Sequence, residues 1–240
     1  LPRHLLDFHP NASTVPIVSS ILGGMIQGEN LDADYWSRQL REPVRFAGSI
    51  QHLLNDGFTA FLEIAPHPIV KESIEECIAH TGKCAAAVAV ATNWRHEDEG
   101  RSIREALGTL FVNGVQIINR AETERKYREE YVYLLPVSGQ IDLAMRHGAK
   151  NLADFMERHS EISLRDISYL SSVRRTHHRT RAVVMGRTRG QILDGLRALA
   201  ERRENSSIRT GTAPVGGRPG LVFVFPGQGS QWVGMGRTLF

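Results

Sequence analysis

Apolar positions in the first half of the chain alternate between continuous runs and helical spacing. Residues 58–64 are apolar at almost every position, which favours a strand covered on both faces, and residues 85–91 form a second such run. A short strand over 15–21 is expected to enter a turn at Gly23-Gly24. Helical spacing predicts helices over 31–41, from Pro43 to Gly57, over 69–78 and over 103–111. This rhythm of strands and helices favours an α/β fold with a partly parallel sheet.

The second half begins with a segment that has almost no apolar stripe. Residues 119–130 balance arginine and lysine against glutamate, which indicates a solvated connector and a domain boundary. Beyond it the pattern predicts strands over 131–137 and 181–185 and helices over 141–159, 164–173 and 192–199. These elements make a small α+β domain. Its buried helix faces are expected to include Leu152, Phe155, Met156, Leu170 and Leu196.

The chain then passes through a linker at 209–220, rich in Gly, Pro and Thr, into an apolar strand over 221–225. The strand ends in the turn PGQGSQ, residues 226–231. Glycines at such a place let backbone N–H groups point outward together, where they can hold an oxyanion or a phosphate. The glycine spacing fits neither a dinucleotide fingerprint nor a Walker loop. From spacing alone, a functional turn and a purely structural turn are equally favoured.

Composition narrows the class of protein. With 240 residues, 41% hydrophobic and 23% charged, the chain is long and apolar enough to bury a core. It shows neither a run that could span a membrane nor a signal peptide, so we expect a cytoplasmic protein without a membrane partner. A net charge of +3 does not favour nucleic acid as a partner. Cys77 and Cys84 cannot by themselves make a disulfide framework or a zinc site, so no metal is expected.

Three stretches resemble the acyltransferase region of modular type I polyketide synthases. Residues 223–236 resemble the opening strand and turn of that domain and of the related malonyl-CoA:carrier-protein transacylases. Residues 34–46 resemble its "YW..QLR.PVRF" block, and residues 61–69 resemble its closing strand and "PHP" turn. Residues 134–213 resemble the small linker domain between ketosynthase and acyltransferase. The resemblance implies that the backbone N–H of Gln228 serves an oxyanion hole, and that Gln39 orients a catalytic histidine.

The resemblance also implies a domain organisation. The fold class expected is α/β: part of an acyltransferase core that is α/β-hydrolase-like, plus a small α+β linker domain. We assign residues 1–118 to the C-terminal part of an acyltransferase domain and 119–133 to the charged connector. Residues 134–214 form the linker domain, and residues 215–240 the first strand and oxyanion-hole turn of an acyltransferase domain.

The order of these segments is the reverse of the family's, and the middle of the acyltransferase is missing. The sequence contains no GHSxG serine, no selectivity arginine after it and no catalytic histidine with its family flanks. A junction between two tandem acyltransferases explains this order, and so does a permuted or excised half of one. The charged stretch at 119–130 resembles a natural connector rather than a splice, which favours the tandem junction. The junction predicts that the strands at 58–64 and 221–225 lie apart. The junction also predicts that Gln39 and Gln228 sit far apart. A permuted half predicts that the two strands share one sheet and that both glutamines face one crevice at the carboxyl ends of the strands.

The function implied is that of a parent enzyme. It would move a malonyl-type extender unit from acyl-CoA to the phosphopantetheine thiol of an acyl carrier protein, by a ping-pong mechanism with serine and histidine. No bound cofactor is expected, and the neighbouring ketosynthase is a further partner. Without its serine and histidine, this segment alone should be inactive. The alternative is a non-catalytic docking module centred on the linker domain, and a nucleic-acid adaptor ranks last.

Other polar residues favour structural interpretations. His67, in a turn flanked by prolines, is more often structural than catalytic. His177 and His178 are adjacent and point apart on a strand, so they are poor joint metal ligands. The basic cluster from Arg174 to Arg181 fits a docking or solvated face better than a phosphate site. Ser230 has no histidine in triad context and is not expected to be a nucleophile.

Overall fold

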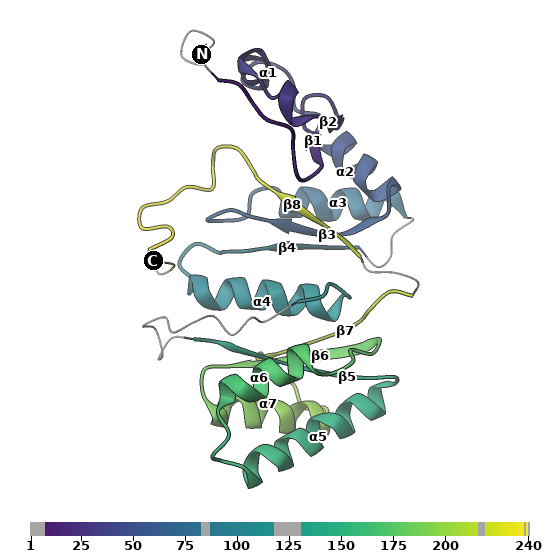
Figure 1. The fold of residues 1–240 in the computed structure, drawn as a ribbon, viewed down its shortest axis with the longest axis vertical. Helices are drawn as coiled ribbons and strands as arrows, with labels where there is room; N and C mark the ends of the chain where they lie inside the picture. Colours follow the sequence, from purple (N-terminus) through teal and green to yellow (C-terminus); the bar gives the residue numbers. More distant parts are fainter. Residues whose placement is uncertain (1–7, 83–86, 118–130, 216–218, 238, 240) are drawn as a thin grey trace. The chain divides into compact units, whose positions relative to one another are not determined.

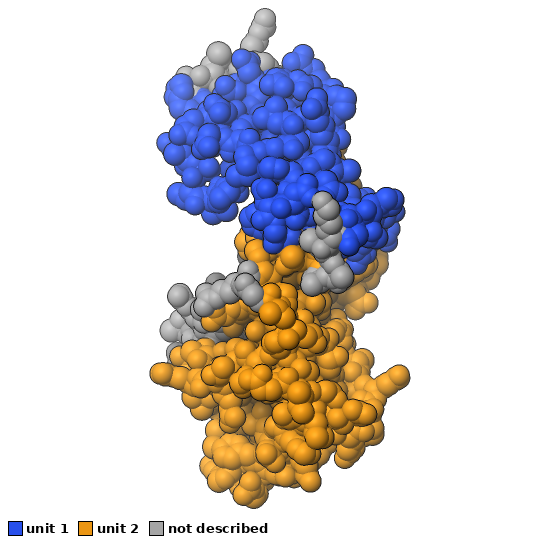
Figure 2. Space-filling model, turned by 90° about the vertical axis from the view of Figure 1, so that its right-hand side faces the viewer, with its two compact units in different colours: residues 1–58, 72–85 blue, residues 59–71, 86–240 orange. Residues whose placement is uncertain are grey.

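The computed structural model describes residues 8–82, 87–117, 131–215, 219–237 and 239. The chain divides into two compact units, which Figure 2 shows in different colours. The first comprises Leu1–Phe58 and Glu72–Ala85, and the second comprises Thr59–Lys71 and Ala86–Phe240. The core of the predicted connector, residues 119–130, lies outside the described residues.

The first unit is built on a small hairpin and three α-helices. Strands β1 (Ile17–Ser19) and β2 (Gly24–Ile26) pair antiparallel, and Gly23 takes the positive φ of 74° that their turn requires. A short 3₁₀ helix, η2 (Gly28–Asn30), leads to α1 (Ala33–Gln39), α2 (Phe46–Asn55) and α3 (Lys71–Thr81). Ile21, Ile26 and Tyr35 form a buried cluster. The helix predicted from Pro43 begins instead at Phe46.

The second unit contains a sheet whose strands come from distant parts of the chain. Its order is β4 (Val88–Ala91), β3 (Phe58–Glu63) and β8 (Gly220–Val224). Strands β3 and β4 are parallel, in register from Ala60 with Val88 to Glu63 with Ala91. Figure 1 shows β8 running in the same direction as β3. The α/β fold class expected from the pattern is confirmed.

The expectation that the strands at 58–64 and 221–225 lie apart is wrong. Beyond the end of β3, the backbone N–H of Ile64 donates to the carbonyl of Val224 at 2.8 Å, and β3 lies between β4 and β8. A lone β3–β4 pair would leave the second row of main-chain groups of β3 unpaired, and β8 lies along that edge. The shared sheet contradicts what the tandem junction predicts and agrees with what a permuted half predicts.

A second sheet in the same unit is antiparallel throughout. Its order is β5 (Tyr133–Gly139), β6 (Thr180–Gly186) and β7 (Ile208–Thr212). Helices α5 (Asp142–Arg158), α6 (Leu164–Val173) and α7 (Arg189–Glu201) supply the core of one face, around Met156 and Leu196. Strand β7 occupies the first part of the predicted linker at 209–220, so this part of the expectation is corrected. Its alternation of exposed threonines with Gly211 hides the strand pattern.

Helix α4 (Glu99–Val112) lies between the two sheets (Figure 1). Ala106 and Leu110 pack against Ala60, Leu62 and Val90 of the first sheet. Phe111 and Val112 pack with Leu134, Val183 and Met185 on the second sheet. The two sheets and α4 thus share one continuous packing, and the predicted boundaries of a separate 134–214 domain stay a prediction.

Two residues expected in the core of the second sheet are on the surface. Leu196 is fully buried and Leu152 is partly buried, as predicted, but Phe155 is 36% and Leu170 is 50% exposed. Met156 is fully buried, as predicted. The rest of the buried stripes of α5 and α6 runs through Met145, Ala149, Ala153 and Ile167. Ala149 and Ala153 let α5 pack close to the sheet. The larger side chain of Phe155, beside this buried face, therefore stays exposed to solvent.

Within the described residues, no helix is both long and apolar enough to cross a membrane.

Candidate functional site

Hydrogen bonds hold the glycine-rich turn after β8 at the end of the sheet where β3 and β4 also end. The indole Nε1 of Trp232 donates to the carbonyl of Pro66 at 3.1 Å, and the backbone N–H of Gly236 donates to Oε1 of the buried Glu99 at 2.5 Å. Carboxyl ends of parallel strands are where open α/β sheets bind ligands. The turn therefore lies where a site is expected in such a sheet.

Gln228 is the exposed residue at the head of this turn. Among the residues that the structure describes, it makes no hydrogen bond, whereas the N–H of the next residue, Gly229, donates to Oε1 of Gln231 at 2.9 Å. Gly229 has a φ of +120°, which disfavours any side chain there. The backbone N–H of Gln228 is thus free to donate to a developing negative charge, but its role in an oxyanion hole stays a prediction.

A buried carboxylate supports the "PHP" turn beside it. Glu63, at the end of β3, is fully buried, and its Oε1 accepts the backbone N–H groups of Ile69 at 2.8 Å and Val70 at 3.2 Å. Its carbonyl accepts the N–H of Thr92 at 3.0 Å. Sequence reasoning missed this residue. The signal was present, since Glu63 is the one charged residue in the apolar run 58–64.

His67 has a structural partner within the turn. Its Nδ1 accepts the backbone N–H of Arg95 at 3.2 Å, and its ring stands edge-on to Trp94 with 5.9 Å between centroids. Accepting at Nδ1 places the proton of the neutral ring on Nε2. The interaction ties the loop after β3 to the loop after β4, which favours the structural interpretation of this histidine.

Gln39 lies in the first compact unit, at the end of α1. Its Nε2 donates to the hydroxyl of Ser20 at 3.2 Å, while its Oε1 is buried and has no hydrogen-bond partner within the described residues. A buried acceptor without a donor is costly, by about 1–3 kcal/mol. The arrangement is suited to receive an N–H group such as that of an imidazole. Sequence reasoning did not anticipate Ser20, which fixes the orientation of this amide.

Gln39 and Gln228 belong to different compact units. The prediction that both face one crevice stays a prediction.

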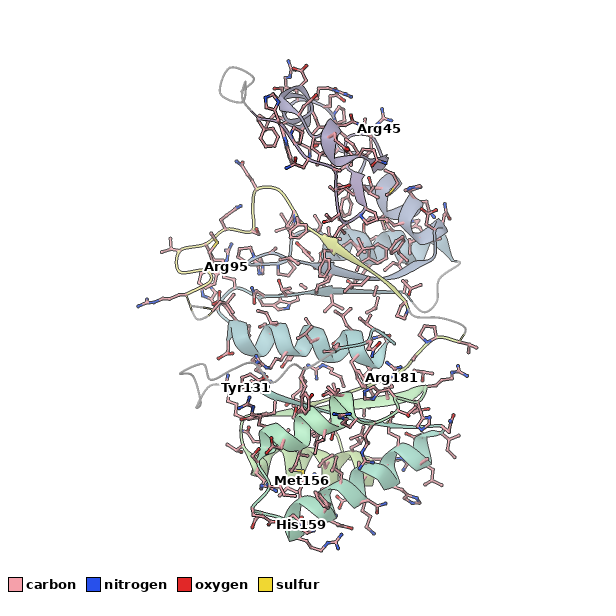
Figure 3. All side chains as sticks on the ribbon, in the orientation of Figure 1. Arg45, Arg95, Tyr131, Met156, His159 and Arg181 are labelled. Atoms are coloured by element: carbon pink, nitrogen blue, oxygen red, sulfur yellow. The ribbon has the colours of Figure 1, made fainter. Side chains whose placement is uncertain are left out.

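Arg181, the last residue of the basic cluster, packs against neighbouring backbone within the second unit, and the docking interpretation of the cluster stays a prediction. Arg181 donates from Nη1 to the carbonyl of Phe111 at 3.0 Å and from Nε to the carbonyl of His178 at 2.9 Å (Figure 3). Burial lowers the pKa of the Arg181 guanidinium, because the charged form loses hydration. His177 binds the carbonyl of Ser172, and His178 contacts the side chain of Gln140, so the two rings point to different partners. Ser230 is buried.

Among the side chains that the structure describes, no group of three or more His, Cys, Asp or Glu residues could hold a metal ion.

Comparison with known proteins assigns both halves of the chain. Residues 1–117 match the family described as "Acyl transferase domain", and residues 133–196 match the family described as "CurL-like, PKS C-terminal". Erythronolide synthase EryA2 of Saccharopolyspora erythraea is 34% identical over 111 residues, covering 46% of this chain. Polyketide synthase GfsB of Streptomyces halstedii is 35% identical over 176 residues, covering 69% of this chain. The chain spans 3% of the length of each of these two relatives.

A solved loading acyltransferase from the avermectin modular polyketide synthase is 29% identical, with a TM-score of 0.42. The alignment covers 46% of this chain and 33% of that one.

The class is therefore defined by the family matches: residues 1–117 match an acyl transferase domain. Together with the second match, this makes the chain a partial acyltransferase region of a modular polyketide synthase.

Proposed function

We propose that the chain contributes to the transfer of a malonyl-type extender unit from acyl-CoA to the phosphopantetheine thiol of an acyl carrier protein. The observation that carries this proposal is the turn at Gln228, placed at the carboxyl ends of the strands in a chain whose first half matches acyl transferase domains. A neighbouring ketosynthase is the further partner proposed, and the cytoplasm, where acyl-CoA is available, is the proposed location. No bound cofactor is needed for this chemistry.

The reaction is a two-step acyl transfer. A serine hydroxyl, losing its proton to a histidine, attacks the thioester carbonyl, and the coenzyme A thiol leaves with that proton. The carrier protein's thiol then attacks the serine ester in the same manner. Both steps pass through an oxyanion, to which preorganised backbone donors contribute about 3–4 kcal/mol each. Gln228 is the residue proposed to supply such a donor.

Gln39 is proposed as the residue that orients the histidine. Its buried and unpartnered Oε1 supports this role, because an imidazole N–H would satisfy it. The serine and the histidine are not recognisable in these 240 residues, so the segment is proposed to be inactive by itself.

The activity proposal is tested with radiolabelled malonyl-CoA. The chain alone should show no covalent label after denaturing electrophoresis, while a complete acyltransferase domain from one of the related synthases should be labelled in parallel. Stoichiometric labelling of any serine of this chain would contradict the proposed inactivity.

The role of Gln39 is tested without activity. Titrating the ¹⁵N-labelled chain with imidazole should shift the side-chain amide resonances of Gln39. The Gln39→Glu variant offers a charged acceptor of similar length and should bind imidazolium more tightly at lower pH, whereas Gln39→Leu should abolish the response of the neighbouring backbone amides. An unchanged titration in Gln39→Leu would remove the support for this role.

The alternative function, a docking module, is favoured by one observation. Helix α4 packs on both sheets, so the half that matches acyl transferase domains and the half that matches the polyketide synthase C-terminal family share a core. A rigid spacer between domains would need such packing.

A further inference from the structure

A groove of about 820 Å³ runs beside β7 in the second compact unit. Strand β7 lines it with Thr210, Gly211 and Thr212. Apolar side chains from α5, α7 and β7 lie along it, namely Met145, Leu199 and Ile208. The start of α5, the end of α7 and Arg181 of β6 supply its charged residues. Neither the acyl transfer proposed above nor the family matches assign a role to this groove.

The strand beside the groove has an unpaired edge. Within the described residues, β7 pairs with β6 alone. The N–H of Ala213 donates to the carbonyl of Arg179, and the N–H of Met185 donates to the carbonyl of Ser207. In an antiparallel ladder, alternate residues face the partner strand, so the peptide groups of Thr210 and Thr212 face away from β6. Both threonines are exposed. The edge thus offers main-chain donors and acceptors to another strand.

The groove carries more guanidinium groups than carboxylates. Four arginines, Arg146, Arg181, Arg202 and Arg203, line it together with Asp142 and Glu204. Arg203 is also paired with Glu201, at 2.7 Å. Arg146 and Arg202 share a single carboxylate, that of Asp142, at 2.8 and 3.0 Å. The Arg146 side chain is only 14% exposed, and its Nε is a buried donor that has no acceptor among the described residues. A buried donor of this kind is stabilised by an additional anionic acceptor.

We propose that this groove binds an extended acidic peptide segment, which adds to β7 as a further strand. Strand addition draws its affinity from main-chain hydrogen bonds and its specificity from alternate side chains. Since alternate residues of the added strand face the groove, an apolar residue would reach Ile208, the partly buried member of its apolar lining. Carboxylates two positions to either side of it would reach the guanidinium groups. The recognised pattern is therefore acidic-x-apolar-x-acidic.

A second copy of this chain is a poor occupant of the same edge. Pairing two β7 edges would bring the two sets of arginines together, and like charges placed opposite one another destabilise strand pairs. The excess of positive charge favours a partner of opposite sign instead.

The test uses the full 240-residue chain labelled with ¹⁵N and an acetylated, amidated peptide that contains Glu-Thr-Leu-Thr-Glu. Binding should shift the backbone amides of Thr210 and Thr212, and it should weaken as salt is raised, because the ion pairs are screened. A peptide with lysine in place of both glutamates should not bind. Nor should a peptide that is N-methylated at the residues facing β7, because it cannot donate to the strand.

Two matched variants separate the groove from general charge effects. The double variant Arg202→Glu with Arg203→Glu should weaken binding by about tenfold or more, because attraction becomes repulsion. Arg165→Glu, on exposed α6 outside the groove, should leave the affinity unchanged. Thr210→Pro removes one outward donor and should also weaken binding. A thermal melt of each variant establishes that it is folded.

Several results would overturn the proposal. Equal binding of the lysine peptide, or equal binding to the Arg202→Glu/Arg203→Glu variant, would refute the charge recognition. Shifts confined to residues away from β7 would refute the strand addition. Shifts of Thr210 and Thr212 that grow with protein concentration in the absence of peptide would assign the edge to self-association.

Discussion

The guanidinium of Arg181 on β6 donates to the carbonyl of Phe111 at the end of α4, with 3.0 Å between Nη1 and the oxygen. The same guanidinium lies over the Phe111 ring, 5.0 Å from its centroid. The Phe111 carbonyl also accepts the backbone N–H of Gly114 at 3.0 Å, so Arg181 adds a charged donor, and a cation at the end of a helix suits the helix dipole. The Arg181 side chain therefore joins α4 to the second sheet.

We expect Arg181→Met to lower the free energy of unfolding by about 1–3 kcal/mol, since the buried carbonyl loses a charged donor. Methionine keeps most of the apolar stem, so the change reports mainly on the charged head. Urea denaturation followed by far-UV circular dichroism measures the effect. The matched Arg165→Met variant, on the exposed side of α6, should stay within about 0.5 kcal/mol of the original chain.

Two helix glycines should respond to alanine in opposite directions. A Cβ on Gly108 of α4 would lie 2.8 Å from Cγ1 of Val183, whereas a Cβ on Gly148 of α5 would lie 3.6 Å from Cγ1 of Val137. Alanine at a helix interior gains about 0.5–1 kcal/mol over glycine where space permits. Gly148→Ala should therefore stabilise the protein, and Gly108→Ala should destabilise it by about 1–3 kcal/mol through overpacking. Equal effects in thermal melts would show that α4 is not clamped against β6.

The buried carboxylate of Glu63 should be needed for the "PHP" turn. Glu63→Ala leaves the N–H groups of Ile69 and Val70 without their acceptor, and a buried unsatisfied group costs about 1–3 kcal/mol. Glu63→Gln keeps one acceptor oxygen and should cost less. Hydrogen exchange of the Ile69 and Val70 amides measures the effect directly. Unchanged protection of these two amides from hydrogen exchange in Glu63→Ala would show that Glu63 does not stabilise the turn.

Asp142 should make stability depend on pH in the acid range. The hydrogen bond from Arg202, helped by the charge of Arg146, lowers the pKa of its carboxyl below the ordinary value of 3.8. Because the folded-state pKa is the lower one, the ionised carboxylate stabilises the fold above the unfolded pKa. That contribution disappears as the pH falls through the folded-state pKa.

The difference in unfolding free energy between the original chain and Asp142→Asn should thus be present at pH 7 and shrink below the ordinary carboxylate pKa. High salt should reduce it as well, because the pair is exposed. Denaturation curves at neutral and acid pH, each at low and high salt, check both expectations. A difference that persists unchanged in acid would assign the effect to something other than the ion pairs.

The sequence predicted the α/β rhythm because strands such as 58–64 are covered on both faces and carry a continuous apolar signal. It placed β7 in a linker because an edge strand with exposed threonines carries almost no such signal. Phe155 and Leu170 were expected in the core, since spacing identifies a face of a helix but not which residues approach closely enough to be buried. Small residues such as Ala149 and Ala153 decide that approach.

The candidate site was predictable only where a motif existed. Gln228 and Gln39 follow from the resemblance. Glu63 stands out as the one charged residue of an apolar run, but neither its partners nor the contact between Ser20 and Gln39 can be found from a local pattern. Glu63 binds N–H groups six and seven residues away, and Ser20 lies 19 residues before Gln39. Such partners are defined by the tertiary fold.

The position of β8 beside β3 has a consequence for how the chain folds during synthesis. The ribosome delivers β3 and β4 first, but β8, which pairs with the open edge of β3, follows only after β7. Until then, β3 presents an open edge to the cell while the whole second sheet is being made, and such edges invite aggregation. The antiparallel sheet and its helices, whose contacts are closer in sequence, can form during that interval. We therefore expect truncation before β8 to leave the antiparallel sheet folded while making the nascent chain dependent on chaperones.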